Sequence, residues 1–278
     1  RKAVSYDEYV TTGGYEGLRK ALSMKPEDVT AEVKDASLRG RGGAGFPTGL
    51  KWTFLPPAEG TQQERLDKGE MRYLAINADE SEPGTFKDRL LMDFDPHIML
   101  EGIAICCYAC RLDKAYVYIR GEYYHQAMMV ENAIKEAYEN GIFGEGGLLN
   151  GMTTATGEPF KVECHVHRGA GAYICGEETA LLESLEGKRG WPRVKPPFPA
   201  VKGLFGRPTI INNVETLAHL PSLIENGKEW FMAQGNEGAG GPPSYGTKLM
   251  GVSGHVNRPG VYECDLGIPL SVLIEAHC

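Results

Sequence analysis

A run of glycines in residues 40–45 is the first feature of the sequence that could bind a ligand. Gly40, Gly42 and Gly45 match the dinucleotide-binding pattern G-x-G-x-x-G. Because glycine has no side chain, the backbone N–H groups of such a loop can approach a phosphate closely. Arg39, Arg41 and Lys51 add positive charge beside this backbone, and Phe46 adds a flat apolar face. A loop of this kind suits an aromatic, anionic ligand such as a nucleotide.

The glycine loop does not stand in the usual context of its pattern, which normally follows a strand and opens a helix. Here it follows residues 26–37, which are typical of a helix with Pro26 in the first turn and acidic residues near its start. The loop is therefore either a dinucleotide-binding loop of a different fold or a flexible connector.

An acidic segment follows the short apolar strand predicted over residues 72–77. Asp79, Glu80 and Glu82 come directly after it, and ligands of open α/β sheets bind at the carboxyl ends of the strands. These carboxylates could accept hydrogen bonds from ribose or ribityl hydroxyls, and they would repel an additional phosphate. The alternative is a solvated acidic turn held by Asn77.

Another glycine-containing segment leads into the helix predicted over residues 176–186. Gly176 leaves the backbone accessible, and Tyr173 would flank a bound ring. Glu177 and Glu178 lie at the helix start, where the helix dipole stabilises acidic residues whether or not they bind a ligand. Both a ligand-binding role and a helix-start role are therefore open for each glutamate.

A basic segment, residues 188–207, contains six Lys and Arg residues and no acidic residue. Its prolines favour an extended backbone, which would present Phe198 at low entropic cost. The segment could form an anion site that stacks a base on Phe198; the alternative is a basic surface loop or a subunit contact. Asn212 and Asn213 follow at the end of the next predicted strand, where they could bond a phosphate or a ring edge.

The bulk composition excludes several classes of protein. A chain of 278 residues that is 42% hydrophobic forms one large or two smaller globular domains and is not disordered. Its net charge of −8 argues against general nucleic-acid binding. The longest apolar run, residues 98–110, is interrupted by Glu101 and is too short to insert across a bilayer.

The seven cysteines predict neither a disulfide framework nor a metal site. Their number is odd and their spacing irregular, which favours a reducing compartment. Cys106, Cys107 and Cys110 lie in an apolar helical run, and no second pair of ligands stands at metal-binding spacing. We expect these three to be small buried hydrophobic residues.

The predicted elements alternate between helices and strands, which indicates an α/β domain with a mainly parallel sheet. The helices are expected over residues 14–24, 26–38, 96–112, 123–140, 176–186 and 214–226, and the strands over 72–77, 114–119, 160–166 and 209–211. The Gly- and Pro-rich residues 236–246 then predict a linker. It separates a domain of residues 1–235 from a second unit, residues 247–278.

The second unit is predicted to begin with a β-hairpin. Strands over residues 247–253 and 260–264 flank the turn-forming residues 257–260, and a helix starts near Pro269. The chain ends within that helical pattern without a stop signal. We therefore expect it to be part of a longer protein.

Together, the four candidate segments are specific, because they occur in a fixed order. The chain resembles the flavin-bearing, NADH-oxidising subunit of respiratory NADH:quinone oxidoreductase (complex I), and the related diaphorase subunits of NAD-linked hydrogenases and formate dehydrogenases. The resemblance covers nearly the whole chain. It implies a Rossmann-like FMN/NADH-binding α/β domain followed by the start of a β-grasp (ubiquitin-like) domain.

The resemblance also implies which residues hold the two ligands. For FMN they are Gly40, Arg41, Gly42, Lys51, Asn77, Asp79, Glu80, Tyr173, Gly176, Glu177, Asn212, Asn213 and Thr216. For NADH, stacked on the exposed face of the flavin, they are Gly43, Phe46, Phe54, Glu82, Glu178, Lys195 and Phe198. Hydride transfer is chemistry of the flavin itself, so no residue is expected to act as a catalytic acid or base.

Two departures from the family stand out. Residues 57–69 are longer than usual; we interpret them as a surface insertion, and the alternative is that they cover the pocket mouth. The family's motif for a 4Fe-4S cluster is absent, because only Cys264 and Cys278 lie beyond the linker. We expect that cluster outside this chain and no metal site within it.

The resemblance further implies partners and a location. The expected partners are a thioredoxin-like 2Fe-2S subunit and an iron–sulfur-rich large subunit, without nucleic acid and without direct membrane insertion. The expected location is the cytoplasmic side of the bacterial inner membrane, or the matrix side in mitochondria. Quinone is the expected final acceptor, and the alternative is a diaphorase role in a hydrogenase, formate dehydrogenase or bifurcating complex.

Two other functions remain open at this stage. An ordinary Rossmann dehydrogenase would pass hydride directly to a substrate, and a nucleotide-binding assembly subunit would catalyse nothing. A bound yellow flavin that NADH bleaches would distinguish the NADH-oxidising flavin module from both of these alternatives.

Overall fold

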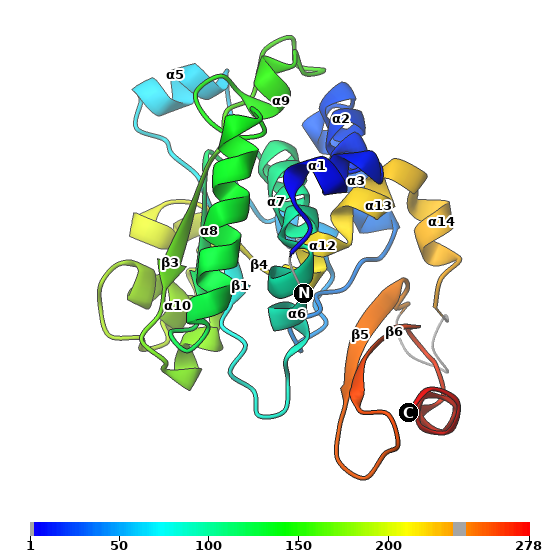
Figure 1. The fold of residues 1–278 in the computed structure, drawn as a ribbon. Coiled ribbons are helices and arrows are strands. Elements are labelled where there is room, and N and C mark those ends of the chain that lie inside the picture. Colours follow the sequence, from blue (N-terminus) through cyan, green and yellow to red (C-terminus); the bar gives the residue numbers. More distant parts are fainter. Residues whose placement is uncertain (1–2, 236–242) are drawn as a thin grey trace.

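The computed structural model describes residues 3–235 and 243–278, and its centre is a sheet of four parallel strands (Figure 1). The strand order is β3-β2-β1-β4. The strands are β1 (Tyr73–Ala78), β2 (Lys114–Ile119), β3 (Glu163–Arg168) and β4 (Thr209–Asn213). All three neighbouring pairs run parallel, which confirms the predicted α/β class.

Both faces of the sheet are covered by apolar groups. In β1, Leu74 and Ile76 belong to the larger apolar cluster on one face, and Tyr73 and Ala75 to a smaller cluster on the other. The smaller cluster is completed largely by side chains of the helix α10 (Glu178–Leu185). Burial on both faces is typical of parallel sheets and explains why β1 is almost entirely buried, whereas the edge strand β3 carries exposed polar residues.

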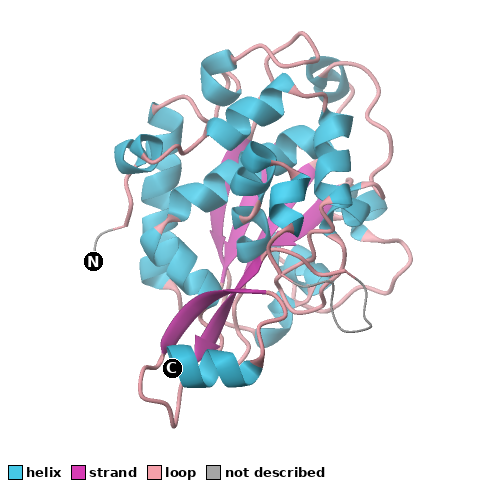
Figure 2. Ribbon diagram, turned by 90° about the vertical axis from the view of Figure 1, so that its right-hand side faces the viewer, coloured by secondary structure: helices cyan, strands magenta, loops and turns pink. Residues whose placement is uncertain are grey.

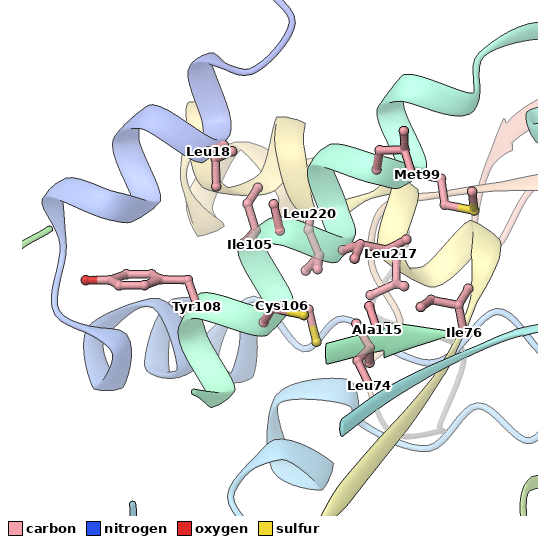
Figure 3. Packing of buried hydrophobic residues seen from close by; sticks show 14 of the residues in the cluster. Leu18, Leu74, Ile76, Met99, Ile105, Cys106, Tyr108, Ala115, Leu217 and Leu220 are labelled. Atoms are coloured by element: carbon pink, nitrogen blue, oxygen red, sulfur yellow. The ribbon is translucent and has the colours of Figure 1, made fainter. Parts of the chain in front are cut away.

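Helix α7 (Pro96–Cys110) is the centre of the larger cluster (Figure 3). It is apolar on every side, and a helix of that kind is stable only when it is surrounded. Its side chains pack between the sheet and the neighbouring helices. No helix in the described part of the chain is long and apolar enough to cross a membrane.

Helices of 5 to 16 residues surround α7 on this face or complete the layer. They are α1 (Tyr6–Thr11), α2 (Glu16–Ser23), α3 (Pro26–Asp35), α6 (Lys87–Phe94), α8 (Tyr124–Glu139), α12 (Val214–Ala218), α13 (Leu220–Asn226) and α14 (Lys228–Met232). Cys106, Cys107 and Cys110 are free and buried among them, as predicted.

Several helix boundaries differ from the prediction for local reasons. Tyr15 adopts a left-handed φ of 67° and donates its backbone N–H to the Glu101 carboxylate at 2.8 Å, so α2 begins at the next residue. Ser37 has a φ of 54°, which ends α3 early. The predicted helix 214–226 is two helices, because Pro221 in the first turn of α13 cannot continue the hydrogen-bond ladder of α12.

The interpretation of residues 57–69 as a surface insertion is wrong in one respect, because the side chain of Arg65 is buried. They contain the helix α5 (Gln62–Asp67), whose Arg65 is only 2% exposed and pairs with Asp113 at 2.8 Å. Asp113 directly precedes β2, so this contact lies at the amino ends of the strands. The segment is therefore anchored into the protein at the edge opposite the carboxyl ends.

The second unit contains the predicted hairpin followed by helical turns (Figure 2). Its antiparallel strands are β5 (Thr247–Val252) and β6 (Gly260–Asp265), and its helical turns are α15 (Leu270–Val272) and η3 (Leu273–His277). Cys264, Leu273 and Cys278 form a small apolar cluster of their own. Residues 236–242 of the predicted linker lie outside the described residues.

The close approach of α7 and α12 gives a stability prediction. A Cβ added at Gly102 would collide with the backbone carbonyl of Leu217. We expect Gly102→Ala to lower the free energy of unfolding in urea by about 3 kcal/mol, despite the better helix propensity of alanine. Gly146→Ala is the matched control, because its Cβ would meet no atom within 4 Å; equal stabilities of the two variants would contradict the prediction.

Candidate nucleotide-binding site

Two adjoining cavities open at the carboxyl ends of β1 and β4. Their volumes are about 480 Å³ and about 860 Å³. The wall that both cavities share is formed by Gly42, Asn77, Gly176, Glu177 and Asn213. Each of these five residues was predicted from the sequence to contact a ligand.

The remaining predicted residues line one cavity or the other. The first is lined by Gly40, Phe46, Lys51, Phe54, Glu178, Lys195, Phe198, Asn212 and Thr216. The second is lined by Arg41, Gly43, Asp79, Glu80, Glu82 and Tyr173. The fold thus brings all four sequence segments to one edge of the sheet.

The glycine loop is a closed turn, which argues against a flexible connector. The N–H of Gly40 donates to the carbonyl of Phe46 at 2.9 Å, directly beside a bridge between Arg39 and Pro47. Gly43 has a φ of 122°, and a Cβ there would meet no protein atom within 4 Å. The loop therefore offers bare backbone to the second cavity, which is the arrangement that a phosphate or a flat ring requires.

The charge of Arg41 is directed at protein atoms. Its guanidinium donates to the carbonyl oxygens of Arg39 and, at 2.7 Å, Tyr245, and burial lowers its pKa to about 10. Its backbone N–H donates to the Thr216 hydroxyl at 2.8 Å. Arg41 therefore fixes the loop, and the positive charge that the sequence places beside the glycines is bound to carbonyl oxygens of the protein.

Glu177 and Glu178 share one partner, Lys195, which lies 3.1 Å from the Glu177 carboxylate, and they differ in the others. Glu177 accepts hydrogen bonds from the backbone N–H groups of residues 179 and 180 and so caps α10. Glu178 pairs with Lys51 at 3.1 Å and with Lys195 at 2.6 Å. Burial opposes the charged form of Glu178, but the two lysines outweigh it and hold the pKa of this carboxyl below its ordinary value.

Three phenylalanines expose their rings around the first cavity. Phe46, Phe54 and Phe198 are 46%, 50% and 57% exposed. The rings of Phe46 and Phe54 lie 6.1 Å apart. Exposed aromatic faces beside a cavity are suited to stacking on a base or another flat ring.

The basic segment is less positive than its sequence indicates. Arg193 pairs with Glu183 at 2.6 Å and with Glu186 at 2.7 Å, and Lys188 also pairs with Glu186. Acidic residues of and just after α10 therefore neutralise much of the segment. Of its basic residues, Lys195 alone is among the described residues that line either cavity.

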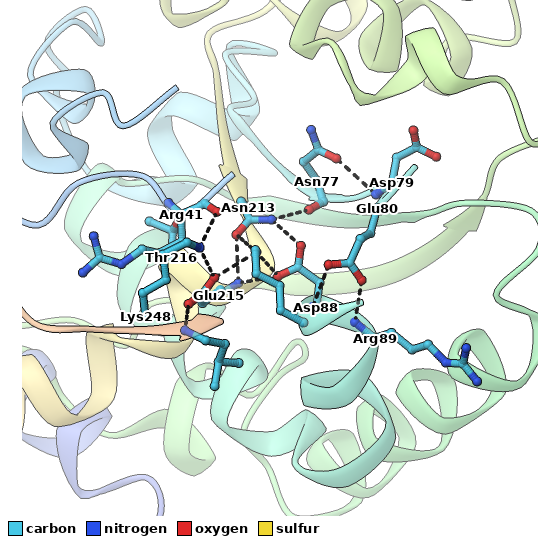
Figure 4. A network of polar contacts seen from close by, with 12 residues as sticks. Arg41, Asn77, Asp79, Glu80, Asp88, Arg89, Asn213, Glu215, Thr216 and Lys248 are labelled. Carbon is cyan, nitrogen blue, oxygen red and sulfur yellow. Dashed lines mark hydrogen bonds and ion pairs between the residues drawn. The ribbon is translucent and has the colours of Figure 1, made fainter. Parts of the chain in front are cut away.

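The acidic segment is also partly structural (Figure 4). The Glu80 carboxylate accepts the backbone N–H groups of Asp88 and Arg89, each at 3.0 Å, and so caps the start of α6. Asp79 accepts from the Ser81 hydroxyl at 3.0 Å, and burial raises its pKa to about 6. The solvated-turn alternative is therefore wrong for both carboxylates.

Asn77 and Tyr173 connect the acidic segment to the glycine-containing segment that precedes α10. The Asn77 side chain donates to the carbonyl of Gly176 at 2.8 Å. The Tyr173 hydroxyl donates to Glu82 at 2.5 Å across the second cavity.

Sequence reasoning missed some lining residues. Thr48 lines the first cavity with a buried hydroxyl that has no partner among the described residues. Lys87 and Asp88 line the second, and they stand inside the acidic segment. Lys248 and its hairpin neighbours also line it. Nothing in the sequence near the hairpin signals this role, because it arises only from tertiary packing.

A parallel α/β sheet with a bare glycine loop and polar side chains at its carboxyl edge defines a nucleotide-binding α/β protein. The chain belongs to the Nuo51 FMN-binding domain family, which matches residues 33–222. This confirms the resemblance drawn from the sequence.

Named relatives agree with this assignment. The chain is 53% identical over 270 residues to an NADH-quinone oxidoreductase subunit of Rhizobium meliloti (strain 1021), covering 97% of this chain and 59% of the relative. It is 50% identical over 270 residues to an NADH-quinone oxidoreductase subunit of Aquifex aeolicus (strain VF5), covering 97% and 58%. The chain therefore spans just over half the length of these relatives.

A solved structure has the same fold. The structure of an NAD⁺-reducing NiFe-hydrogenase in the H₂-reduced state matches with a TM-score of 0.76 and 40% identity. The match covers 95% of this chain and 41% of that chain.

The raised pKa of Asp79 predicts how stability depends on pH. Between its ordinary pKa of 3.8 and about 6, the folded protein holds the proton that the unfolded chain has lost. This carboxyl therefore lowers the unfolding free energy as pH rises through that range. We expect Asp79→Asn to be more stable than the natural protein at pH 7, by on the order of 1 kcal/mol. In urea titrations the difference should vanish near pH ~4; a difference independent of pH would contradict the assignment.

Proposed function

We propose that this chain is the FMN-bearing, NADH-oxidising module of a multi-subunit oxidoreductase. The observation that carries the proposal is the convergence of twenty residues from four separate segments on two adjoining cavities. When bound, FMN would supply the hydride acceptor and release electrons one at a time. The chain's own residues bind and orient the two ligands, and none is proposed as an acid or base.

The thirteen residues assigned to FMN fit that ligand chemically. The glycine loop presents backbone without side chains toward the second cavity. Lys51, held by the Ile211 carbonyl at 2.8 Å, places a cation in the first. The wall shared by the cavities carries the amides of Asn77 and Asn213, whose partners fix their orientation. Such fixed polar groups suit the hydroxyls and ring edges of a flavin nucleotide.

The seven residues assigned to NADH provide stacking and charge. Phe46 and Phe198 expose rings on which an adenine could stack. Glu178 carries a carboxylate whose charge two lysines maintain. A carboxylate at this position can accept hydrogen bonds from ribose hydroxyls, as the acid in nucleotide sites of the α/β class does.

The proposal extends to the complex to which the chain would contribute. Electrons would leave FMN for iron–sulfur clusters outside this chain, toward quinone as in relatives named NADH-quinone oxidoreductase. The alternative, a diaphorase role, is favoured by the similarity to the NAD⁺-reducing hydrogenase. We propose a thioredoxin-like 2Fe-2S subunit and an iron–sulfur-rich large subunit as partners, and a peripheral position on the cytoplasmic side of a bacterial inner membrane or the mitochondrial matrix side.

We also propose a division of the chain into domains. Residues 1–235 would form the FMN- and NADH-binding domain, 236–246 a linker, and 247–278 the start of a β-grasp domain. The separate two-stranded sheet and its own apolar cluster support the last part.

The deciding experiment is the visible spectrum of the purified protein. A bound flavin gives a yellow protein, and NADH added without oxygen should bleach it. A colourless protein that binds NAD would instead favour a Rossmann dehydrogenase. Failure to bind either ligand would favour a non-catalytic subunit.

Glu178 gives a prediction about coenzyme choice. Its negative charge would face the additional phosphate of NADPH, and like charges at close range are strongly unfavourable in a partly desolvated pocket. In Glu178→Ala, turnover of NADH should weaken and turnover of NADPH should rise at least about tenfold, because the repelling carboxylate is gone while Lys51 and Lys195 remain beside the cavity, Lys195 still paired with Glu177.

Glu178→Gln separates charge from shape, since it keeps the size of the side chain. It should also admit NADPH. If both coenzymes lose activity in equal proportion in the two variants, Glu178 only supports the helix start and its lysines, and selectivity lies elsewhere.

A further inference from the structure

The β5 strand of the hairpin forms part of the second cavity. Residues 248–251 line it together with the acidic segment and the glycine loop. Gly251 lies against this segment, since a Cβ there would be 3.5 Å from the ring of Phe86. The proposed FMN site is therefore closed on one side by a segment that belongs to a different sheet.

A buried carboxylate, Glu215, bonds the hairpin to the rest of the site. Glu215 is 2% exposed. One of its oxygens accepts the backbone N–H of Leu249 at 2.7 Å, and the other accepts the Lys248 ammonium at 3.1 Å. Lys248 also donates to the Arg41 carbonyl at 3.5 Å. β5 thus contacts both α12 and the glycine loop.

The same carboxylate is tied to residues on the cavity wall (Figure 4). Lys87 pairs with Glu215 at 2.9 Å and with Asp88 at 2.7 Å. Asp88 in turn accepts the side-chain amide of Asn213 at 2.6 Å. Asn213 is the N-cap of α12, and Glu215 is in the first turn of that helix. A displacement of Glu215 would therefore displace Asn213 and the Lys87–Asp88 pair.

We propose that Lys248 is a positioning residue for FMN: by holding Glu215, it fixes Asn213 and the Lys87–Asp88 pair, so that docking of the hairpin and binding of FMN are energetically coupled. The inference rests on the proposed function, since it takes FMN as the ligand. Coupling of this kind is reciprocal. The hairpin strengthens FMN binding, and bound FMN holds the hairpin in place by the same factor.

The first test measures the affinity of the flavin-free protein for FMN by quenching of FMN fluorescence. Lys248→Met should weaken binding about tenfold, within the usual range of such couplings. Lys248→Arg keeps the charge and should restore most of the affinity. Lys228→Met is the matched control, because it removes a lysine that pairs with Asp35 at 2.9 Å away from both cavities.

A double-mutant cycle distinguishes positioning from direct contact with the ligand. If Lys248 acts through Glu215, Lys248→Met should add little to the effect of Glu215→Gln. Additive effects would mean that Lys248 contacts FMN itself and would overturn the proposal. Equal affinity of Lys248→Met and the natural protein would overturn it as well.

Hydrogen exchange of the natural protein tests the coupling without any variant. FMN should slow exchange of the Leu249 amide, which Glu215 binds. Unchanged exchange on saturation with FMN would overturn the coupling, even if Lys248→Met does not fold. If the natural protein binds no FMN at all, the proposed function fails, and that result is distinct from normal binding without coupling.

Discussion

The pairing of β1 with β4 is the contact on which the site depends. Asn77 and Asn213 lie opposite each other in this pair, although 136 residues separate them in the chain. Parallel strands end at the same edge, so the segments that follow them open on a common space. The acidic segment continues from β1 and the helix α12 from β4, and the glycine loop is bonded to that helix through Thr216. Leu74 and Ile76 of β1 and Ile210 of β4 belong to the same apolar cluster as the side chains of α7.

Much of this arrangement could be predicted from the sequence, because its signals are local. The buried strand β1 and the mostly apolar α7 follow from side-chain composition alone. The glycine loop and the acidic segment were recognisable because backbone access and carboxylate chemistry each demand particular residue types. The rule for parallel sheets placed the acidic segment at the carboxyl edge. The resemblance to a known family implied the full set of twenty residues, all of which line the two cavities.

Side-chain partners could not be predicted in the same way, because they depend on distant segments. Arg41 was expected to add positive charge beside the glycine loop, and the sequence did not signal that its guanidinium donates to a carbonyl that lies 204 residues further on. Arg193 was expected to add positive charge to the basic segment, but Glu183 and Glu186 pair with it. Arg65 was assigned to the surface, although Asp113 draws it into the interior. In each case the charged group binds protein atoms that the fold brings near, carbonyl oxygens for Arg41 and carboxylates for Arg193 and Arg65.

The wall shared by the two cavities limits how this protein could be redesigned or could evolve. Asn77, Gly176 and Asn213 each border both spaces. A substitution at any of them alters the walls of both cavities at once. A substitution that raises the affinity for one ligand therefore lowers the affinity for the other. Phe54 and Phe198 border only the first space, and variation there is free of that conflict. Diversification of ligand preference within this architecture should therefore begin at the outer rim, while the dividing wall stays constant.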